Sequence, residues 1–299
     1  EAGCTAPPYG IIADRFPPEK RARALATYSL GIPMGQAAGA LLGAVIAASV
    51  DWRAAFIVLG VAGLLVVLPF RKVVKDQPQV ADAVAVPVMD TFRRLAAQPT
   101  FWLISLGAAT GSLVAYGLAF WIPTVVQQNY GLSLSQTGQF LAAQQLLAGS
   151  VGMYAGGFLA DRIGRGDRAN YARIAALGYL LCFPLLFIAL NAASATMLFV
   201  LLLLPSALIY VWLGPVVTAV QHLVPANERA TASACFLFVN NLIGLTLGSL
   251  VIGWLAEHFE PTHGAEALRL ACVSVSALYL LATLLMFLAA PRLRRVWLS

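Results

Sequence analysis

The chain has 299 residues, of which 60% are hydrophobic and only 11% are charged, and its formal net charge at pH 7 is +6. Its mean hydropathy is +0.80. A soluble globular domain carries about 25% charged residues because its surface must be hydrated, so this composition excludes that class. A nucleic-acid-binding protein would gather its basic residues on one folded surface. Here long apolar runs separate them, and we expect no nucleic-acid partner.

Eight long apolar segments follow one another along the chain. A hydrocarbon core of about 30 Å needs about 20 apolar residues per helix, whereas the strands of a membrane β-barrel would be shorter and alternate in polarity. We therefore predict an all-α membrane protein with about eight complete spanning helices, and part of a ninth at residues 1–13. The eight predicted spans are residues 24–48, 54–70, 101–126, 136–160, 171–191, 195–220, 230–256 and 265–290.

The positive charges fall on one side of the membrane if these eight helices alternate in direction. Only Arg53 and Arg269 then lie on the opposite side, and the remaining 17 of the 19 Lys and Arg residues share one face. That face is cytoplasmic by the positive-inside rule. We predict a multi-pass protein of the inner (plasma) membrane, surrounded by the lipid bilayer, with a cytoplasmic C-terminus. The segments on the basic side are residues 14–23, 71–99, 161–173, 221–231 and 291–299.

An internal repeat relates two distant parts of the chain. Residues 16–47 align with residues 224–255, so that Pro17 and Arg21 fall on Pro225 and Arg229. The offset of about 208 residues is the length of six helices with short connections. It predicts two six-helix halves and three further helices before Glu1. The predicted domains are residues 1–71, a remnant of the N-terminal bundle holding helices 4–6; residues 72–99, a cytoplasmic linker with a short interfacial helix near 89–97; and residues 100–299, the C-terminal bundle of helices 7–12.

The loop after the span 136–160 carries a specific motif. Gly157 is followed by Asp161, Arg162, Gly164 and Arg165, and this spacing resembles the G-x-x-x-D-R-x-G-R signature of the major facilitator superfamily. Gly157 lets two helices approach closely, and Gly164 permits a tight turn. The resemblance implies a major facilitator-type helical bundle in which this charge cluster latches one conformation. The alternative is a solvated basic loop that serves only membrane topology.

Further segments resemble the spinster-like branch of that superfamily in bacteria. They are Glu1-Ala-Gly, residues 12–21, residues 28–33, Leu213-Gly214-Pro215 and residues 240–244. The resemblance implies that Glu1, on a fourth helix, couples transport to protons. Asp14 begins the loop after this helix, and Glu1 lies about 20 Å further along the helix, which places it inside the hydrocarbon core. Ionisable groups inside a membrane are functional candidates by default. A hydrogen-bonded packing residue is the alternative.

Neutral polar and aromatic side chains at mid-helix depth are the candidates for a substrate cavity. The apolar spans hold no buried Lys or Arg that would offset the desolvation of an anionic substrate. Such a cavity suits an amphipathic or lipid-like solute, which the spinster resemblance also implies. Aromatic anchors at the membrane interface and amides that bridge helices are the alternatives for each residue. The candidates are Tyr28, Tyr116, Gln144, Gln145, Tyr210, Trp212, Asn240 and Asn241.

A glycine ladder lies on one face of the predicted helix 24–48, at positions 31, 35, 39 and 43. Small residues at this spacing let helices pack closely. Helix packing is the favoured interpretation of the ladder, and a sliding surface between transport states is the alternative.

Catalytic and metal chemistry find no support in the sequence. The four cysteines form no C-x-x-C pair and the three histidines lie in loops or at helix ends, so we predict no metal, no cofactor and no enzyme. We predict a secondary active transporter that moves a small organic, amphipathic or lipid-like solute by alternating access, coupled to protons. A non-transporting membrane receptor or scaffold, and an inactive fragment of a transporter, are the alternatives.

Overall fold

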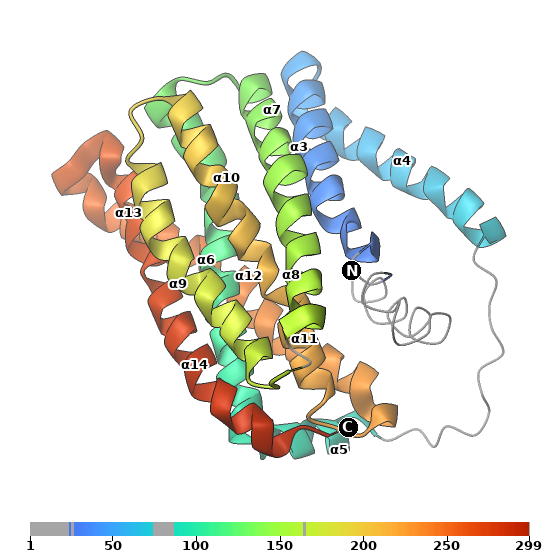
Figure 1. The fold of residues 1–299 in the computed structure, drawn as a ribbon. Helices are drawn as coiled ribbons and strands as arrows, with labels where there is room; N and C mark the ends of the chain where they lie inside the picture. The colour runs from blue at the N-terminus through green and yellow to red at the C-terminus, as the bar shows by residue number, and fades with distance from the viewer. Residues whose placement is uncertain (1–23, 25–26, 74–86, 164–165, 299) are drawn as a thin grey trace.

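The computed structural model describes residues 24, 27–73, 87–163 and 166–298, and these form helices joined by short turns (Figure 1). The predicted all-α class is confirmed for this part of the chain. Glu1, Gly164 and Arg165 lie outside the described residues. In chain order the elements are α3 (Gly31–Ser49), α4 (Trp52–Val73), α5 (Val88–Ala96), α6 (Pro99–Tyr130), α7 (Leu134–Gln144), the π-helical turn η1 (Gln145–Gly149), α8 (Ser150–Ile163), α9 (Asn170–Leu190), α10 (Ala195–Val211), α11 (Leu213–Gln221), the 3₁₀ turn η2 (Ala226–Glu228), α12 (Arg229–His263), the 3₁₀ turn η3 (Gly264–Glu266), α13 (Ala267–Ser276) and α14 (Leu278–Val296).

Six continuous helical stretches in the described part are long and apolar enough to cross a membrane. One of them, Arg229–Val296, covers two predicted spans, because only the 3₁₀ turn η3 separates α12 from α13 along the chain. The predicted span 136–160 is helical as α7, η1 and α8 but is not among the six. Its glutamines and glycines lower its hydropathy. All eight predicted spans therefore fall on helices, although their boundaries differ by several residues.

The predicted helix 195–220 is interrupted at Trp212, where α10 ends and α11 begins. Pro215 explains the break, because it has no N–H to donate to the carbonyl of Val211 four residues earlier. Proline is well tolerated in the first turn of α11, where N–H groups lack helical partners. The Val211 carbonyl instead faces Gly156 of α8, and a Cβ built on Gly156 would lie 2.5 Å from that oxygen.

Local capping sets several helix ends. Gly131 closes α6 in the left-handed conformation, with φ 68°, which glycine adopts without steric cost. Ser133 then opens α7 in a reciprocal capping box with Gln136, which satisfies backbone N–H groups that would otherwise lack partners. The turn between these two spans is thus encoded within six residues.

Helix α6 lies at the centre of the bundle formed by α6 to α14, with 61% of its apolar window buried. Its closest neighbour is α12, where glycines replace side chains at the contact. A Cβ on Gly117 would lie 2.6 Å from the carbonyl oxygen of Gly248, and one on Gly244 would lie 2.9 Å from the Cβ of Ser112. Glycines at such sites let two backbones approach directly. On its other side α6 packs against α14.

Helices α3 and α4 lie to one side of this bundle (Figure 1). Helix α3 packs antiparallel along α7 and η1, since a Cβ on Gly138 would lie 2.8 Å from the Ala40 oxygen, and one on Gly149 would lie 2.8 Å from the Cβ of Pro33. We call this contact the α3–α7 seam. Helix α4 packs on α3, and only 6% of its apolar window is buried by the described residues.

The glycine ladder of α3 has no packing partner among the described residues. A Cβ built on Gly31, Gly35, Gly39 or Gly43 meets no atom within 4 Å. The seam uses a different stripe of the helix, in which Pro33 and Ala37 are buried. The predicted packing role of the ladder therefore finds no support in this part of the chain.

Helix α5 occurs where the linker was predicted to contain a short helix. Its Thr91 and Leu95 are fully buried, and its polar contacts converge on Glu228, which precedes α12 and is 3% exposed. Thr91 Oγ1 donates to Glu228 Oε2 at 3.0 Å, and Arg94 Nη1 lies 3.0 Å from Glu228 Oε1. The sequence segment that leads into α6 is thereby clamped to the start of α12.

Candidate functional site

A polar cluster lies between α6 and α12 at mid-helix depth. Ser112 Oγ donates to Asn240 Oδ1 at 2.9 Å, in a buried contact. Asn240 Nδ2 donates in turn to Asn241 Oδ1 at 3.3 Å, and Tyr116 OH donates weakly to the same oxygen at 3.5 Å. Asn240 is buried and Tyr116 is exposed, so the cluster runs from the bundle interior to its surface.

A second group joins three different elements. The Tyr210 hydroxyl of α10 lies 2.6 Å from Gln36 Oε1 of α3 and 3.0 Å from Gln145 Oε1 of η1. Helix α10, which carries Tyr210, also contacts α6, which carries Tyr116. The two groups thus lie on contacting helices, and together they hold five of the predicted cavity residues: Tyr116, Gln145, Tyr210, Asn240 and Asn241.

Gln36 was not among the predicted cavity residues. It stands alone as an amide within the apolar run of α3, and this isolation is the signal that could have identified it. A polar side chain in a membrane helix usually faces a partner helix or a cavity. Its partner Tyr210 lies 174 residues away in the sequence, so the pairing itself could not be foreseen.

The other predicted cavity residues lie elsewhere. Gln144 is 5% exposed and its Nε2 donates to the carbonyl of Phe199 on α10. Trp212 is buried and packs edge-on against Phe236. Tyr28 lies on the helical residues just before α3 and is partly exposed.

The chemistry of the two groups is neutral hydrogen bonding. They hold amide, phenol and hydroxyl groups and no Lys, Arg, Asp or Glu among the described residues. In the same part of the chain, no three His, Cys, Asp or Glu side chains are grouped as metal ligands. The arrangement can orient a polar head that donates and accepts hydrogen bonds. The two residues that follow Gln145 in η1, Leu146 and Leu147, are exposed apolar side chains.

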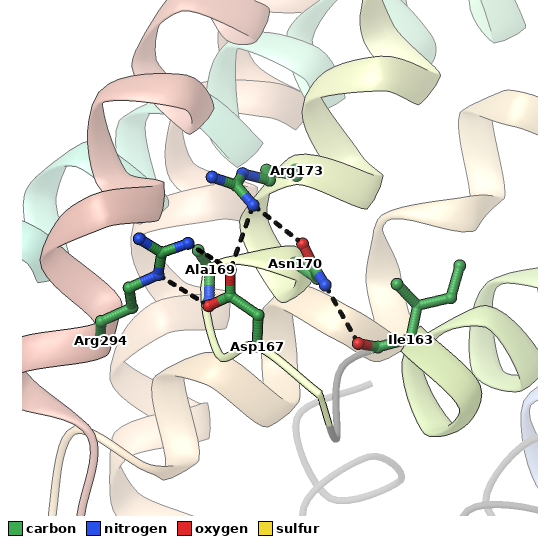
Figure 2. A network of polar contacts seen from close by, with 6 residues as sticks. All are labelled: Ile163, Asp167, Ala169, Asn170, Arg173 and Arg294. Carbon is green, nitrogen blue, oxygen red and sulfur yellow. Dashed lines mark hydrogen bonds and ion pairs between the residues drawn. The ribbon is translucent and has the colours of Figure 1, made fainter.

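The motif at the end of α8 leads into a charged cluster centred on Asp167 (Figure 2). Arg294 of α14 binds both Asp167 oxygens, with Nε at 2.8 Å from Oδ1. Arg173 Nη1 of α9 lies 3.1 Å from Oδ2, and the Ala169 N–H donates to Oδ1 at 3.0 Å. These bonds, chiefly the one from Arg294, hold the pKa of Asp167 well below its ordinary value. The cluster ties the α8–α9 loop to the end of α14.

The described latch residues Gly157 and Arg162 make contacts outside this cluster. Gly157 approaches α11 closely, since a Cβ on Gly214 would lie 3.6 Å from the Gly157 Cα. Arg162 is exposed and its guanidinium lies 5.8 Å from the Phe158 ring. The side chain of Asp161 lies outside the described residues. Asp167, six residues beyond Asp161, was not predicted as a latch residue, and its partner Arg294 is 127 residues distant.

The C-terminal end of the chain docks beside the same loop. The His222 ring stacks on Trp297 with centroids 4.3 Å apart, and the Arg168 guanidinium lies 4.9 Å from the centroid of that indole. His222 Nδ1 lies 2.7 Å from the Leu298 carbonyl oxygen. Because a carbonyl only accepts, a hydrogen bond here requires the tautomer with the proton on Nδ1. Burial lowers the pKa of His222, and the nearby Arg229 and Arg168 lower it further.

At the opposite end of the bundle a cavity of about 240 Å³ opens between α6, α9 and η3. Arg269 binds Glu266 and Asn191 there, and Asn129 Nδ2 donates to Glu266 Oε1 at 3.3 Å. None of the predicted cavity residues lines this space. Its polar contacts join the ends of three helices.

Comparison with known proteins decides the family. The family model described as Major Facilitator Superfamily matches residues 1–248. The chain belongs to the Major Facilitator Superfamily. It is 30% identical to an MFS-type efflux pump of Mycolicibacterium smegmatis over 302 residues, which cover 99% of this chain and 69% of the relative. It is 27% identical to protein spinster homolog 3 of Danio rerio over 276 residues, which cover 83% of this chain and 54% of the relative.

A solved structure confirms the fold of this superfamily member. The chain superposes with a TM-score of 0.78 on a bacterial homolog to the human lysosomal transporter Spinster in an inward-facing and unoccupied conformation. The two are 25% identical, and the alignment covers 99% of this chain and 76% of that one. The predicted superfamily and its spinster-like branch are thus confirmed. The chain spans about half the length of the spinster homologs of animals. It is a multi-pass membrane protein of a transporter family.

Proposed function

We propose that the protein is a secondary active transporter for a small amphipathic solute with an uncharged, hydrogen-bonding head. The observation that carries the proposal is that neutral polar side chains of α3, α6, α10 and α12 form two hydrogen-bonded groups on contacting helices, with Tyr210 bonded across the α3–α7 seam. An ionic head would lose its hydration there without meeting an opposite charge from the described residues. The exposed apolar side chains Leu146 and Leu147 suit a hydrocarbon tail.

The relatives support transport by alternating access, in which two halves rock around a site near the middle of the membrane. One relative is an efflux pump, and a solved structure similar to this chain is inward-facing. We extend the proposal to two six-helix halves joined by residues 72–99, to a cytoplasmic C-terminus in the inner membrane, and to the loop 157–165 as a conformational latch.

The test is transport by the complete protein in proteoliposomes. Fluorescent single-chain amphiphiles that share one tail would carry a neutral, a cationic or an anionic head. We expect uptake of the neutral compound and a reduction of about tenfold or more for Asn241→Leu, because a buried polar head left unpaired loses its compensation. Equal uptake of all three heads, or an unaltered Asn241→Leu, would contradict the proposal. Binding of the neutral compound without flux would instead indicate a receptor.

Glu1 is the proposed site of proton coupling. The proposal comes from the spinster-like resemblance and from the position of a carboxylate within a predicted membrane helix. In the same proteoliposomes, Glu1→Gln should abolish proton movement that depends on the neutral amphiphile while leaving the binding of that amphiphile intact. Coupled proton flux that persists in Glu1→Gln would assign Glu1 to helix packing.

A further inference from the structure

The Tyr210 hydroxyl faces two acceptors but carries one proton. Gln36 Oε1 lies at 2.6 Å and Gln145 Oε1 at 3.0 Å, and a phenol donates a single hydrogen bond. The two acceptors lie on opposite sides of the α3–α7 seam. Gln36 is on α3, across the α3–α7 seam, whereas Gln145 is on η1, which packs with α10 in the same bundle as Tyr210.

We propose that Tyr210 is a hydrogen-bond switch that controls the separation of α3 from α7. With the seam closed, the O–H donates to Gln36 and bridges the seam. With the seam open, the O–H turns to Gln145, which is already within hydrogen-bond distance. Because Gln145 can accept the hydrogen bond of the Tyr210 hydroxyl, breaking the bond to Gln36 does not leave that hydroxyl unsatisfied. Most of the free-energy cost of opening the seam at this point is therefore avoided. The proposal rests on the proposed transport function and names the element that biases its two states.

Tyr210 and Gln145 lie directly at the contact between η1 and α3. Gly149 ends η1, and a Cβ there would lie 2.8 Å from the Cβ of Pro33, 2.9 Å from Gln145 Oε1 and 3.3 Å from Cε2 of Tyr210. The Pro33 ring of α3, the phenol and the amide therefore meet around one residue without a side chain. Single π-helical turns such as η1 are frequent at functional sites.

The switch predicts opposite effects for its two acceptors. Gln36→Leu removes the bridging acceptor and should favour the open seam. Gln145→Leu removes the acceptor of the open state and should favour the closed seam. Each change should shift the ratio of open to closed molecules by about threefold to tenfold, in opposite directions, which is the net effect of one hydrogen bond. Tyr210→Phe removes both bonds and should fall between them.

The experiment measures the seam directly. Nitroxide labels on Ser49→Cys and Leu134→Cys, at the facing ends of α3 and α7, would be placed in the complete protein with its native cysteines replaced by alanine. Pulsed EPR in liposomes without substrate then gives the distance distribution for each variant. Tyr179→Phe is the matched control, because the Tyr179 hydroxyl is buried and has no hydrogen-bond partner within the described part of the chain.

Each outcome decides the proposal. Opposite shifts for Gln36→Leu and Gln145→Leu, with Tyr179→Phe unchanged, would support the switch. Shifts in the same direction, or no shift in either variant, would overturn it and assign Tyr210 to ordinary packing. The readout needs no transport. Opposite shifts without amphiphile flux would refute the proposed function and support the switch. Normal amphiphile flux without shifts would support the proposed function and refute the switch.

Discussion

Glycines at the contact between α8 and α10 mark where the bundle tolerates no added volume. A Cβ on Gly152 would overlap the Ala207 carbonyl and lie 2.6 Å from its carbon and 2.8 Å from its Cα. These are backbone atoms, which cannot rotate away as a flexible side chain could. The Gly152 position therefore determines how closely the two helices lie.

Gly152→Ala should lower the stability of the protein by about 1–3 kcal/mol, the usual cost of overpacking a well-packed interior. The midpoint of thermal unfolding in detergent would report the loss. Gly178→Ala, where the new Cβ would lie 3.5 Å from the Leu208 oxygen, makes an ordinary contact and serves as the control. Equal midpoints for the two variants would contradict this account of the α8–α10 contact.

His222 should make the docking of the C-terminal end depend on pH. Its pKa is lowered in the folded protein, chiefly by burial, so a detached imidazole binds protons more readily than a docked one. The docked end is then fully stable above the ordinary histidine pKa of about 6.5 and loses stability as the pH falls below it. The charged groups near the ring are Arg229 and Arg168, and both oppose protonation.

A fluorophore on Leu298→Cys, with the native cysteines replaced, would report this detachment as a loss of anisotropy below about pH 6.5. His222→Phe can still stack on Trp297 but has no proton to bind, so its anisotropy should be independent of pH over the same range. The assignment to His222 fails if the phenylalanine variant shows the same loss.

At the scale of elements, α5 is held to α12 by one nearly buried carboxylate. Glu228→Ala would leave the buried hydroxyl of Thr91 without its acceptor and would release Arg94. The loss of about 1–3 kcal/mol should speed amide hydrogen exchange in α5 by about fivefold to a hundredfold. Mass spectrometry of exchange in residues 88–96 would measure the change.

Asp90→Asn is the control for that measurement. The Asp90–Arg93 pair spans 4.0 Å, and its side chains are 55% and 76% exposed. Pairs of this kind contribute little, so exchange in α5 should change by less than about twofold. A similar acceleration in both variants would show that Glu228 is not the specific anchor.

Each spanning helix could be predicted from the sequence because hydrophobic length decides whether a segment crosses a membrane. The break at Trp212 could also have been read from Pro215, since its missing N–H leaves the Val211 carbonyl unpaired. For the candidate site, the residue types could be predicted from the sequence, but their arrangement could not. The neutral polar residues were identified, but Gln144 and Trp212 turn into the bundle, and the partners of Tyr210 and Asp167 come from helices distant in the sequence.

At the scale of the whole molecule, the basic side chains of the described residues gather at one end, and only Arg53 and Arg269 lie at the other. Helix α5 and the C-terminus lie at one end of the bundle (Figure 1). Arg269 lies on α13, which begins near the other end (Figure 1). If the positive-inside rule holds, a membrane-impermeant maleimide added outside intact cells should label Ala193→Cys and spare Met89→Cys. Permeabilised cells should label both. The reverse pattern in intact cells would invert the proposed orientation.

The glycine contact between α6 and α12 makes α12 a lever. This helix has 35 residues and is therefore about 52 Å long, and its contact with α6 through Gly244 and Gly248 lies near its middle. Each arm is about 26 Å long on that estimate. A tilt of about 5° around the contact would displace each end by about 2 Å, which is enough to break a hydrogen bond of ordinary length. Small rearrangements beside Asn240 would thus be amplified at both membrane surfaces, at the Glu228 clamp on one side and at the turn holding Glu266 on the other.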